Sequence, residues 1–170
     1  MYRISSGQVS SGITLSHDSM YVSSGGTANS TTVNDSGYLY VSSGGTANET
    51  TVNDNGQMYV FNGASALTIR ENGGYVDVAD GASVSFVANS FSGLLLFHRA
   101  TLHSGTTANE TTLSGMIVSS GTNWFVTCMG SLYISSGGTA NNTVVNTSGF
   151  VFVSSGGTAN NTMVNSGGIN

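Results

Sequence analysis

The 170-residue sequence has no proline, no lysine and a single cysteine. Proline cannot donate a backbone hydrogen bond, so its absence suits a fold in which nearly every N–H bonds to a neighbouring strand. Cys128 stands alone, which excludes an internal disulfide. Three arginines against eight acidic residues give a formal net charge of −5. So few cations cannot neutralise a run of phosphates, which argues against nucleic acid as a partner.

Long apolar runs and helical patterns are also missing. No stretch reaches the roughly 18 apolar residues of a spanning helix, so we expect no membrane insertion by this segment. The start lacks the basic and then apolar pattern of a signal peptide. Gly, Asn, Ser and Thr are weak helix formers, and apolar residues do not recur at spacings of three and four. These absences predict an all-β protein, which we interpret as a fragment of a longer exported chain because a solenoid cut at both ends exposes sheet edges.

One phrase dominates what is present. Val22–Asn29 reads Val-Ser-Ser-Gly-Gly-Thr-Ala-Asn, and it recurs with one conservative change at residues 41–48, 134–141 and 153–160. The apolar residues that open successive units are Ile4, Val22, Val41, Val60, Val78, Phe97, Val118, Ile134 and Val153. Their spacing of about nineteen residues predicts a single-stranded parallel β-helix, or β-solenoid, of about nine coils that forms one repeat domain over residues 1–170.

Each coil is expected to hold three short strands and three corners. Gly44-Gly45 turns the chain once, a second bend falls near Asn48, and Asp54–Gly56 forms the third corner. The opening residues form one inward column, and a second contains Val33, Val52, Ile69, Leu113, Val145 and Val164. We expect a row of asparagines at a corner, where their side-chain amides stack and hydrogen-bond to one another: Asn29, Asn48, Asn109, Asn141 and Asn160.

The repeat is least regular between about residues 77 and 132. The spacing predicts a bulge near residues 98–103 that carries His98, Arg99 and His103. Insertions in solenoids often carry an added function, so the alternative hypothesis is a glycan-binding or glycan-cleaving protein with its site there. Asp77 and Asp80 flank a strand end and are not held as an acid and base pair, while Arg70 and Glu71 are interpreted as solvated corner residues. We therefore expect no enzyme.

Metal and cofactor sites are not predicted either. The repeated Gly-Gly is followed by Thr-Ala-Asn and not by the carboxylate pattern of calcium-binding β-rolls. His98 and His103 are too few to hold zinc. Two outward threonine columns resemble those of ice-binding solenoids, but Val144 and Met163 interrupt one of them, and threonine is in any case a good strand former.

An aromatic column lies on the outside of the predicted coils. Its members are Tyr21, Tyr40, Tyr59, Tyr133 and Phe152, with Tyr38, Tyr75 and Phe150 nearby. Such rings can cover a thin core by stacking along the solenoid, or they can form an adhesive stripe for glycans or for another rod. Both interpretations are compatible with the sequence.

The extended phrase Val-Ser-Ser-Gly-Gly-Thr-Ala-Asn-x-Thr-x-Val-Asn, present at residues 22–34, 41–53, 134–146 and 153–165 in close or slightly varied form, resembles the nineteen-residue repeat of AIDA-type autotransporter adhesins. The resemblance implies a β-helical passenger, at the bacterial cell surface or secreted through the outer membrane, that mediates adhesion, self-association and biofilm formation. It also implies a glycoprotein, modified by a glycosyltransferase on repeat serines. The candidate acceptors are Ser23, Ser24, Ser42, Ser43, Ser135, Ser136, Ser154 and Ser155.

The sequence therefore predicts a cell-surface adhesin segment that associates with like rods, with host or bacterial surface glycans or proteins as further partners. Its candidate interaction surface comprises Tyr21, Tyr40, Tyr59, Tyr133, Phe152, His98, Arg99 and His103. The export signal and membrane anchor of an autotransporter are not in this chain.

Overall fold

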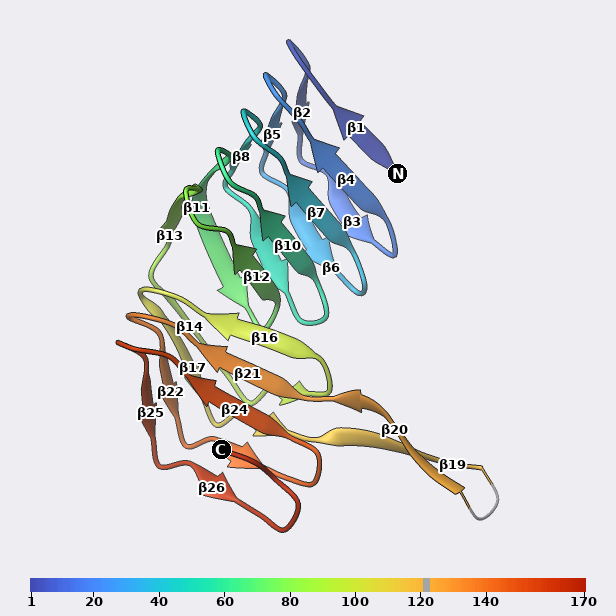
Figure 1. Ribbon diagram of the computed structural model, residues 1–170, viewed down its shortest axis with the longest axis vertical. Helices are drawn as coiled ribbons and strands as arrows, with labels where there is room; N and C mark the ends of the chain where they lie inside the picture. The colour runs from blue at the N-terminus through green and yellow to red at the C-terminus, as the bar shows by residue number, and fades with distance from the viewer. Residues whose placement is uncertain (121–122) are drawn as a thin grey trace. The chain divides into compact units, whose positions relative to one another are not determined.

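The computed structural model describes the backbone of residues 1–120 and 123–170, and the side chains of residues 1–114 and 129–170. Every regular element in these ranges is a β-strand. The chain forms two compact units, residues 1–87 and 88–170. Each unit contains a stack of coils whose strands pair in parallel, as Figure 1 shows. The predicted all-β parallel solenoid is confirmed.

The first unit has three faces. The first face contains β1 (Tyr2–Ile4), β4 (Ser19–Val22), β7 (Tyr38–Val41), β10 (Gln57–Val60) and β12 (Tyr75–Val78). The second contains β2 (Val9–Ser11), β5 (Thr27–Asn29), β8 (Thr46–Asn48), the start of β11 (Ser65–Asn72) and β13 (Ser83–Phe86). The third contains β3 (Thr14–Ser16), β6 (Thr32–Asn34), β9 (Thr51–Asn53) and the end of β11. The predicted three strands per coil are therefore present.

The second unit repeats this plan. Its first face contains β16 (Arg99–Leu102), β21 (Ser131–Ile134) and β24 (Phe150–Val153). Its second face contains β14 (Asn89–Ser92), β17 (Thr106–Asn109), β22 (Thr139–Asn141) and β25 (Thr158–Asn160). Its third contains β15 (Leu95–Leu96), β18 (Thr112–Leu113), β23 (Val144–Val145) and β26 (Met163–Val164).

Alternation along each strand separates the core from the surface. In β7, Leu39 and Val41 are fully buried, whereas Tyr38 and Tyr40 are only half-buried. Parallel pairing in exact repeat register places Val22, Val41 and Val60 in one inward column. Each fully buried Val or Leu contributes about 1.5–3 kcal/mol, so these inward columns are a main source of the stability of the coil.

The second inward column contains an unexpected residue. Val52 pairs in register with Glu71, and the Glu71 side chain is fully buried. The prediction that Glu71 is a solvated corner residue and that Ile69 continues this column was therefore wrong. Ile69 lies two positions earlier, beside Thr50, because β11 keeps the same register as β9. Arg70, in contrast, is exposed as predicted.

A column of threonines also points inward at the second corner. Thr31, Thr50, Thr111 and Thr143 are each no more than 1% exposed. The column ends in apolar residues at Ile13 and Ile69 in the first unit. In the second unit it begins at Leu94 and ends in another threonine, Thr162. The sequence predicted only outward columns of threonine, because a residue at a bend belongs to no alternating pattern that would indicate its direction.

The real irregularity of the second unit is a hairpin. β19 (Gly115–Ser120) and β20 (Asn123–Met129) pair antiparallel and extend from the coils as a two-stranded ribbon (Figure 1). The interpretation of Val118 as the start of a coil was therefore wrong, and its side chain lies outside the described residues. Asn109 and Asn141 are consequently 32 residues apart, although they occupy neighbouring coils.

The bulge predicted near residues 98–103 is not where the extra residues lie. Arg99–Leu102 form β16, which pairs with β21 without a register shift. Leu102, and not Phe97, occupies the opening position in this coil, since it pairs with Ile134. The first faces of the two units contain five and three strands, so the solenoid has about eight turns and not nine.

Candidate functional site

The Ser-Ser-Gly-Gly phrase forms a type II turn at the first corner of the coil. The N–H of Gly45 donates to the carbonyl oxygen of Ser42 at 2.8 Å, and Gly44 has a φ of 72°. A Cβ atom on Gly45 would lie 2.7 Å from the carbonyl oxygen of Val22 in the preceding coil. The first glycine therefore supplies the left-handed conformation, and the second allows two coils to approach each other.

The second serine of each phrase is the more accessible candidate acceptor. Ser24, Ser43, Ser136 and Ser155 are exposed in all four repeats. The first serine is exposed at Ser23 and Ser154 but half-buried at Ser42 and Ser135. Its N–H bonds to the preceding coil, as in the 2.8 Å bond from Ser42 to the carbonyl oxygen of Val22. The corner thus presents one row of freely exposed hydroxyls and one row that is partly covered.

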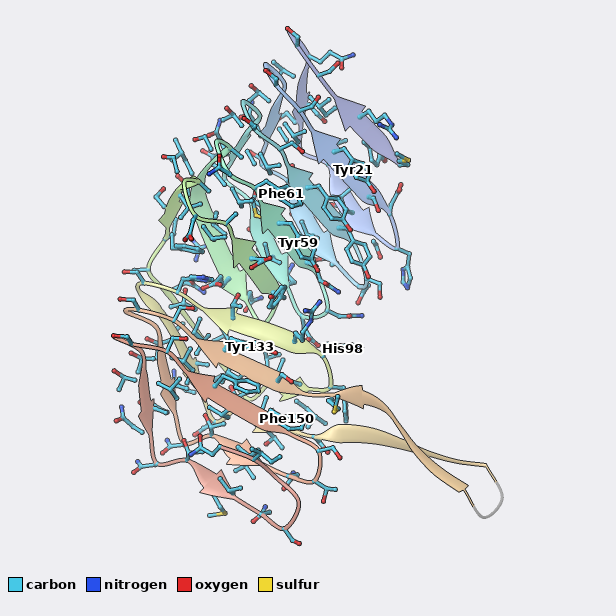
Figure 2. All side chains as sticks on the ribbon, viewed as in Figure 1. Tyr21, Tyr59, Phe61, His98, Tyr133 and Phe150 are labelled. Carbon is cyan, nitrogen blue, oxygen red and sulfur yellow. The ribbon has the colours of Figure 1, made fainter. Side chains whose placement is uncertain are left out.

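Three tyrosines of the first unit form a continuous stack. The ring centroids of Tyr21 and Tyr40 are 4.8 Å apart, and those of Tyr40 and Tyr59 are 5.3 Å apart, with interplanar angles of 13° and 11°. The Arg3 guanidinium lies 5.5 Å from the Tyr21 centroid at one end, and Tyr75 packs against Tyr59 in a T-shaped pair at the other. Figure 2 shows Tyr21 and Tyr59 on the outer side of the strands that carry them.

The second unit has a shorter stack. The ring centroids of Tyr133 and Phe152 are 4.9 Å apart, and the Phe150 ring lies nearly parallel to that of Phe152, with the centroids 6.2 Å apart. In the first unit, the ring faces are thus occupied by neighbouring rings or, at Tyr21, by a cation, whereas Phe152 at the end of the second stack is 45% exposed. In the first unit, only ring edges and phenol hydroxyls remain accessible to a partner, which favours protein contacts over the face-on stacking that aromatic platforms offer.

Burial changes the acidity of the central tyrosine. The pKa of Tyr40 is raised above its ordinary value, first by burial and then by the negative charges that Tyr21, Tyr59 and Tyr38 acquire on ionisation. The Tyr40 phenol therefore keeps its proton, and with it a hydrogen-bond donor, to a higher pH than an ordinary tyrosine does.

The residues of the predicted bulge belong to the regular coil. The carbonyl oxygen of His98 accepts a hydrogen bond from the N–H of Ser131 at 3.1 Å. The carbonyl oxygen of His103 accepts one from the N–H of Thr106 at 3.0 Å, so His103 takes the place of the first serine in a turn equivalent to Ser-Ser-Gly-Gly. Arg99 begins β16 between them. The three side chains therefore occupy successive places on one face and corner and do not converge on a loop.

Amide ladders follow two corners of the coil. Asn48 donates to Asn29 at 2.9 Å, and Asn141 donates to Asn109 at 3.0 Å, as predicted. A second ladder was missed: Asn53 donates to Asn34 at 2.6 Å, and Asn165 donates to Asn146 at 2.7 Å. The recurrent Thr-Val-Asn at the end of the repeat was the signal that could have revealed it. Both ladders leave hydrogen-bonding groups at the surface along each stack.

No group of three or more His, Cys, Asp or Glu side chains that could hold a metal ion is present among the described residues. The same part of the chain contains no helix long and apolar enough to cross a membrane. Asp77 pairs in register with Tyr59 on the outside of β12, whereas Asp80 lies in the turn that follows.

Comparison with known proteins identifies one family. The family described as "Adhesin of bacterial autotransporter system, probable stalk" matches residues 17–74 and 123–168, which is more than half of the chain. No curated protein matches the chain significantly. Among solved structures, a TibC-catalysed hyper-glycosylated TibA fragment is 24% identical over 98% of this chain and 89% of that one, with a TM-score of 0.39.

Proposed function

Because this chain belongs to the family of adhesins of the bacterial autotransporter system, whose stalk it matches, we propose that it is a non-catalytic segment of a cell-surface or secreted passenger. It promotes adhesion, self-association and biofilm formation, and residues 1–170 act as a single repeat domain of a longer passenger. The observation that carries this proposal is the family match, which falls on both units and on the coils with the most regular ladders.

The absence of catalysis is supported by the placement of the acids. Asp77 lies on strand β12, and Asp80 lies in the turn that follows it. The sequence has only eight acidic residues and three histidines in total. A general acid and base must converge on one substrate atom, which these positions do not favour. His98, Arg99 and His103 form part of a regular coil, so no observation favours the glycan-cleaving alternative.

Self-association is proposed to occur side by side, through two kinds of surface. Tyr21, Tyr40 and Tyr59 present ring edges and hydroxyls on the first face. Thr27 and Thr46 present half-buried hydroxyls on the second, beside the Asn29 and Asn48 amides. Each contact is weak, but contacts repeated in every coil add up when two chains align.

Cell aggregation tests this proposal. The chain is displayed on the surface of a non-aggregating bacterium, and settling is compared among an aromatic variant (Y21S/Y59S), a hydroxyl variant (T27E/T46E) and a control (H98A/R99A/H103A). We expect the first two to settle more slowly and the control to settle like the parent. Loss of settling in the control alone would support the glycan-binding alternative, and unchanged settling in both surface variants would refute association through these faces.

The chain is also proposed to be a glycoprotein, with a glycosyltransferase as its modifying partner. The exposed second serines, Ser24, Ser43, Ser136 and Ser155, are the preferred acceptors, and the first serines Ser23, Ser42, Ser135 and Ser154 are secondary. Intact-mass measurement of protein from its native host should show increments of one hexose or heptose. In a variant with all four second serines changed to alanine, most of that added mass should disappear. Retention of the full mass would exclude these acceptors.

A further inference from the structure

A hollow of about 220 Å³ lies on the surface of the first unit, away from the aromatic stack. It is lined by Glu49, Thr51, Thr68, Arg70 and Val87. Pockets for drug-sized ligands measure about 300–1,000 Å³, so this one has room for a single small molecule of monosaccharide size. All five residues belong to the first unit.

The hollow exists because the ladder changes register there. β13 pairs with Ala66 and then with Ile69, where a regular coil would continue without a shift. The N–H of Thr68 consequently donates to the side-chain oxygen of Ser85 at 3.0 Å. At the equivalent position one coil earlier, the N–H of Glu49 donates to a backbone carbonyl, that of Leu67, at 2.9 Å. The stacking of like residues is thus interrupted beside Thr68.

Two of the lining residues have a backbone conformation that favours glycine. Glu49 has a φ of 55° and Thr68 a φ of 63°, and a β-branched residue is rarely found in this region. The first coil of each unit has glycine at the same corner, Gly12 and Gly93. Other coils have the same conformation at this corner, with a φ of 51° at Ser30 and at Glu110. The β-branched side chain of Thr68 is therefore what distinguishes this corner from the others.

Arg70 brings a positive charge to this hollow. It occupies the position held by Thr14, Thr32 and Thr51 in the three preceding coils. Its side chain is exposed, and within the part of the chain that the structure describes it makes no hydrogen bond or ion pair. Glu49 lines the same hollow but uses one carboxylate oxygen, Oε2, to accept a bond of 2.9 Å from Ser30 Oγ. Five guanidinium donors and one carboxylate oxygen therefore remain for a ligand.

We propose that this hollow binds an acidic sugar residue, a monosaccharide that carries a carboxylate and neighbouring hydroxyls. The Arg70 guanidinium pairs with the carboxylate through two parallel hydrogen bonds. Thr51, Thr68 and the Glu49 carboxylate bond to the ring hydroxyls, and Val87 packs against the apolar C–H side of the ring. Glu49 also repels compact anions such as sulfate, which have no hydroxyl to donate to its carboxylate. This site goes beyond the adhesive role and does not depend on self-association.

The three arginines allow a direct test by NMR, because each has one Nε–H group to follow. The 170-residue chain is titrated with D-glucuronate, D-glucose and acetate, and the same titrations are made with the variant R70Q and the charge-matched control R3Q. We expect glucuronate to bind at millimolar concentration and to shift the Arg70 signal. R70Q should bind it about tenfold or more weakly, since a charged hydrogen-bond partner is lost, and R3Q should bind like the parent.

Two further probes decide the chemistry. Glucose and acetate should each bind much more weakly than glucuronate, because each offers only half of the required groups. Equal binding of acetate would overturn sugar recognition, and equal binding of glucose would overturn the role of Arg70. Unchanged affinity of R70Q, or equal shifts at Arg3 and Arg99, would overturn the site. Far-UV circular dichroism confirms that the exposed substitutions leave the fold intact, and cell settling measures the adhesive role separately.

Discussion

Replacing the buried threonine of a coil by valine should stabilise the protein. In the described part of the chain, the hydroxyls of Thr50, Thr111, Thr143 and Thr162 are buried without a hydrogen-bond partner. A buried, unpaired hydroxyl costs about 1–3 kcal/mol, and valine replaces it by a methyl group of similar shape. Ile69 already fills the place next to Thr50, which shows that an apolar side chain fits this column.

We therefore expect T50V in the first unit and T143V in the second to raise the free energy of unfolding by about 1 kcal/mol each. For a chain of this length, each should raise Tm by about 2–4 °C. The two sites lie in different units, so their effects should add.

Urea unfolding followed by far-UV circular dichroism provides the measurement. The control is T51V, because Thr51 is half-buried on the outside of β9 and its change should stay within about 0.5 kcal/mol. If T50V and T143V lower the urea midpoint while T51V does not, the buried hydroxyls are paired in solution and the reasoning is refuted.

Three further predictions concern the corners, the amide ladder and the tyrosine stack. G44N should be tolerated, since asparagine adopts the left-handed conformation and Ser24 Oγ can move away. G45A should lower the free energy of unfolding by about 1–3 kcal/mol, because its Cβ meets the Val22 backbone. Equal urea midpoints for the two variants would contradict this difference. N48A should cost about 1 kcal/mol by removing the 2.9 Å bond to Asn29, while N161A at the exposed end of its stack should cost less than about 0.5 kcal/mol by the same assay. The raised pKa of Tyr40 means that the folded state holds the phenol proton more tightly than the unfolded state does. The stability gained in this way is complete below the ordinary pKa of 10.0 and is lost as pH rises through the raised value. Y40F should therefore make the free energy of unfolding fall less steeply above about pH 10, and an identical pH profile would contradict the assignment.

The sequence predicted the repetitive part of the fold because identical residues demand identical surroundings. Val22, Val41 and Val60 could be placed in one inward column from their spacing alone, and the Asn29 and Asn48 ladder followed from the same argument. Each glycine at a corner confirmed the period independently.

What could not be predicted depends on departures from the repeat. Counting apolar residues forced Phe97 and Val118 into coils, because spacing does not distinguish an inserted hairpin from two coils of unequal length. Glu71 is buried because it continues the inward column of Val52. Its charge alone predicted a solvated residue, which was wrong. The hollow beside Arg70 arises from a register shift in β13, which involves a residue missing from one coil and leaves no motif. The roles proposed for the serines and aromatics concern partners, on which spacing is silent.

The base of the β19–β20 hairpin shows how freely this architecture accepts foreign sequence. Ser114 bonds to Leu96 and Gly130 bonds to Ser114, just as Asn146 bonds to Leu113 and Gly149 bonds to Asn146 one turn later. Only Thr147 and Ser148 lie between Asn146 and Gly149, whereas residues 115–129 lie between Ser114 and Gly130. Since lengthening a loop adds little closure entropy, the third corner is a ready-made grafting point, at which epitopes or enzymes could be displayed without redesigning the scaffold beneath them.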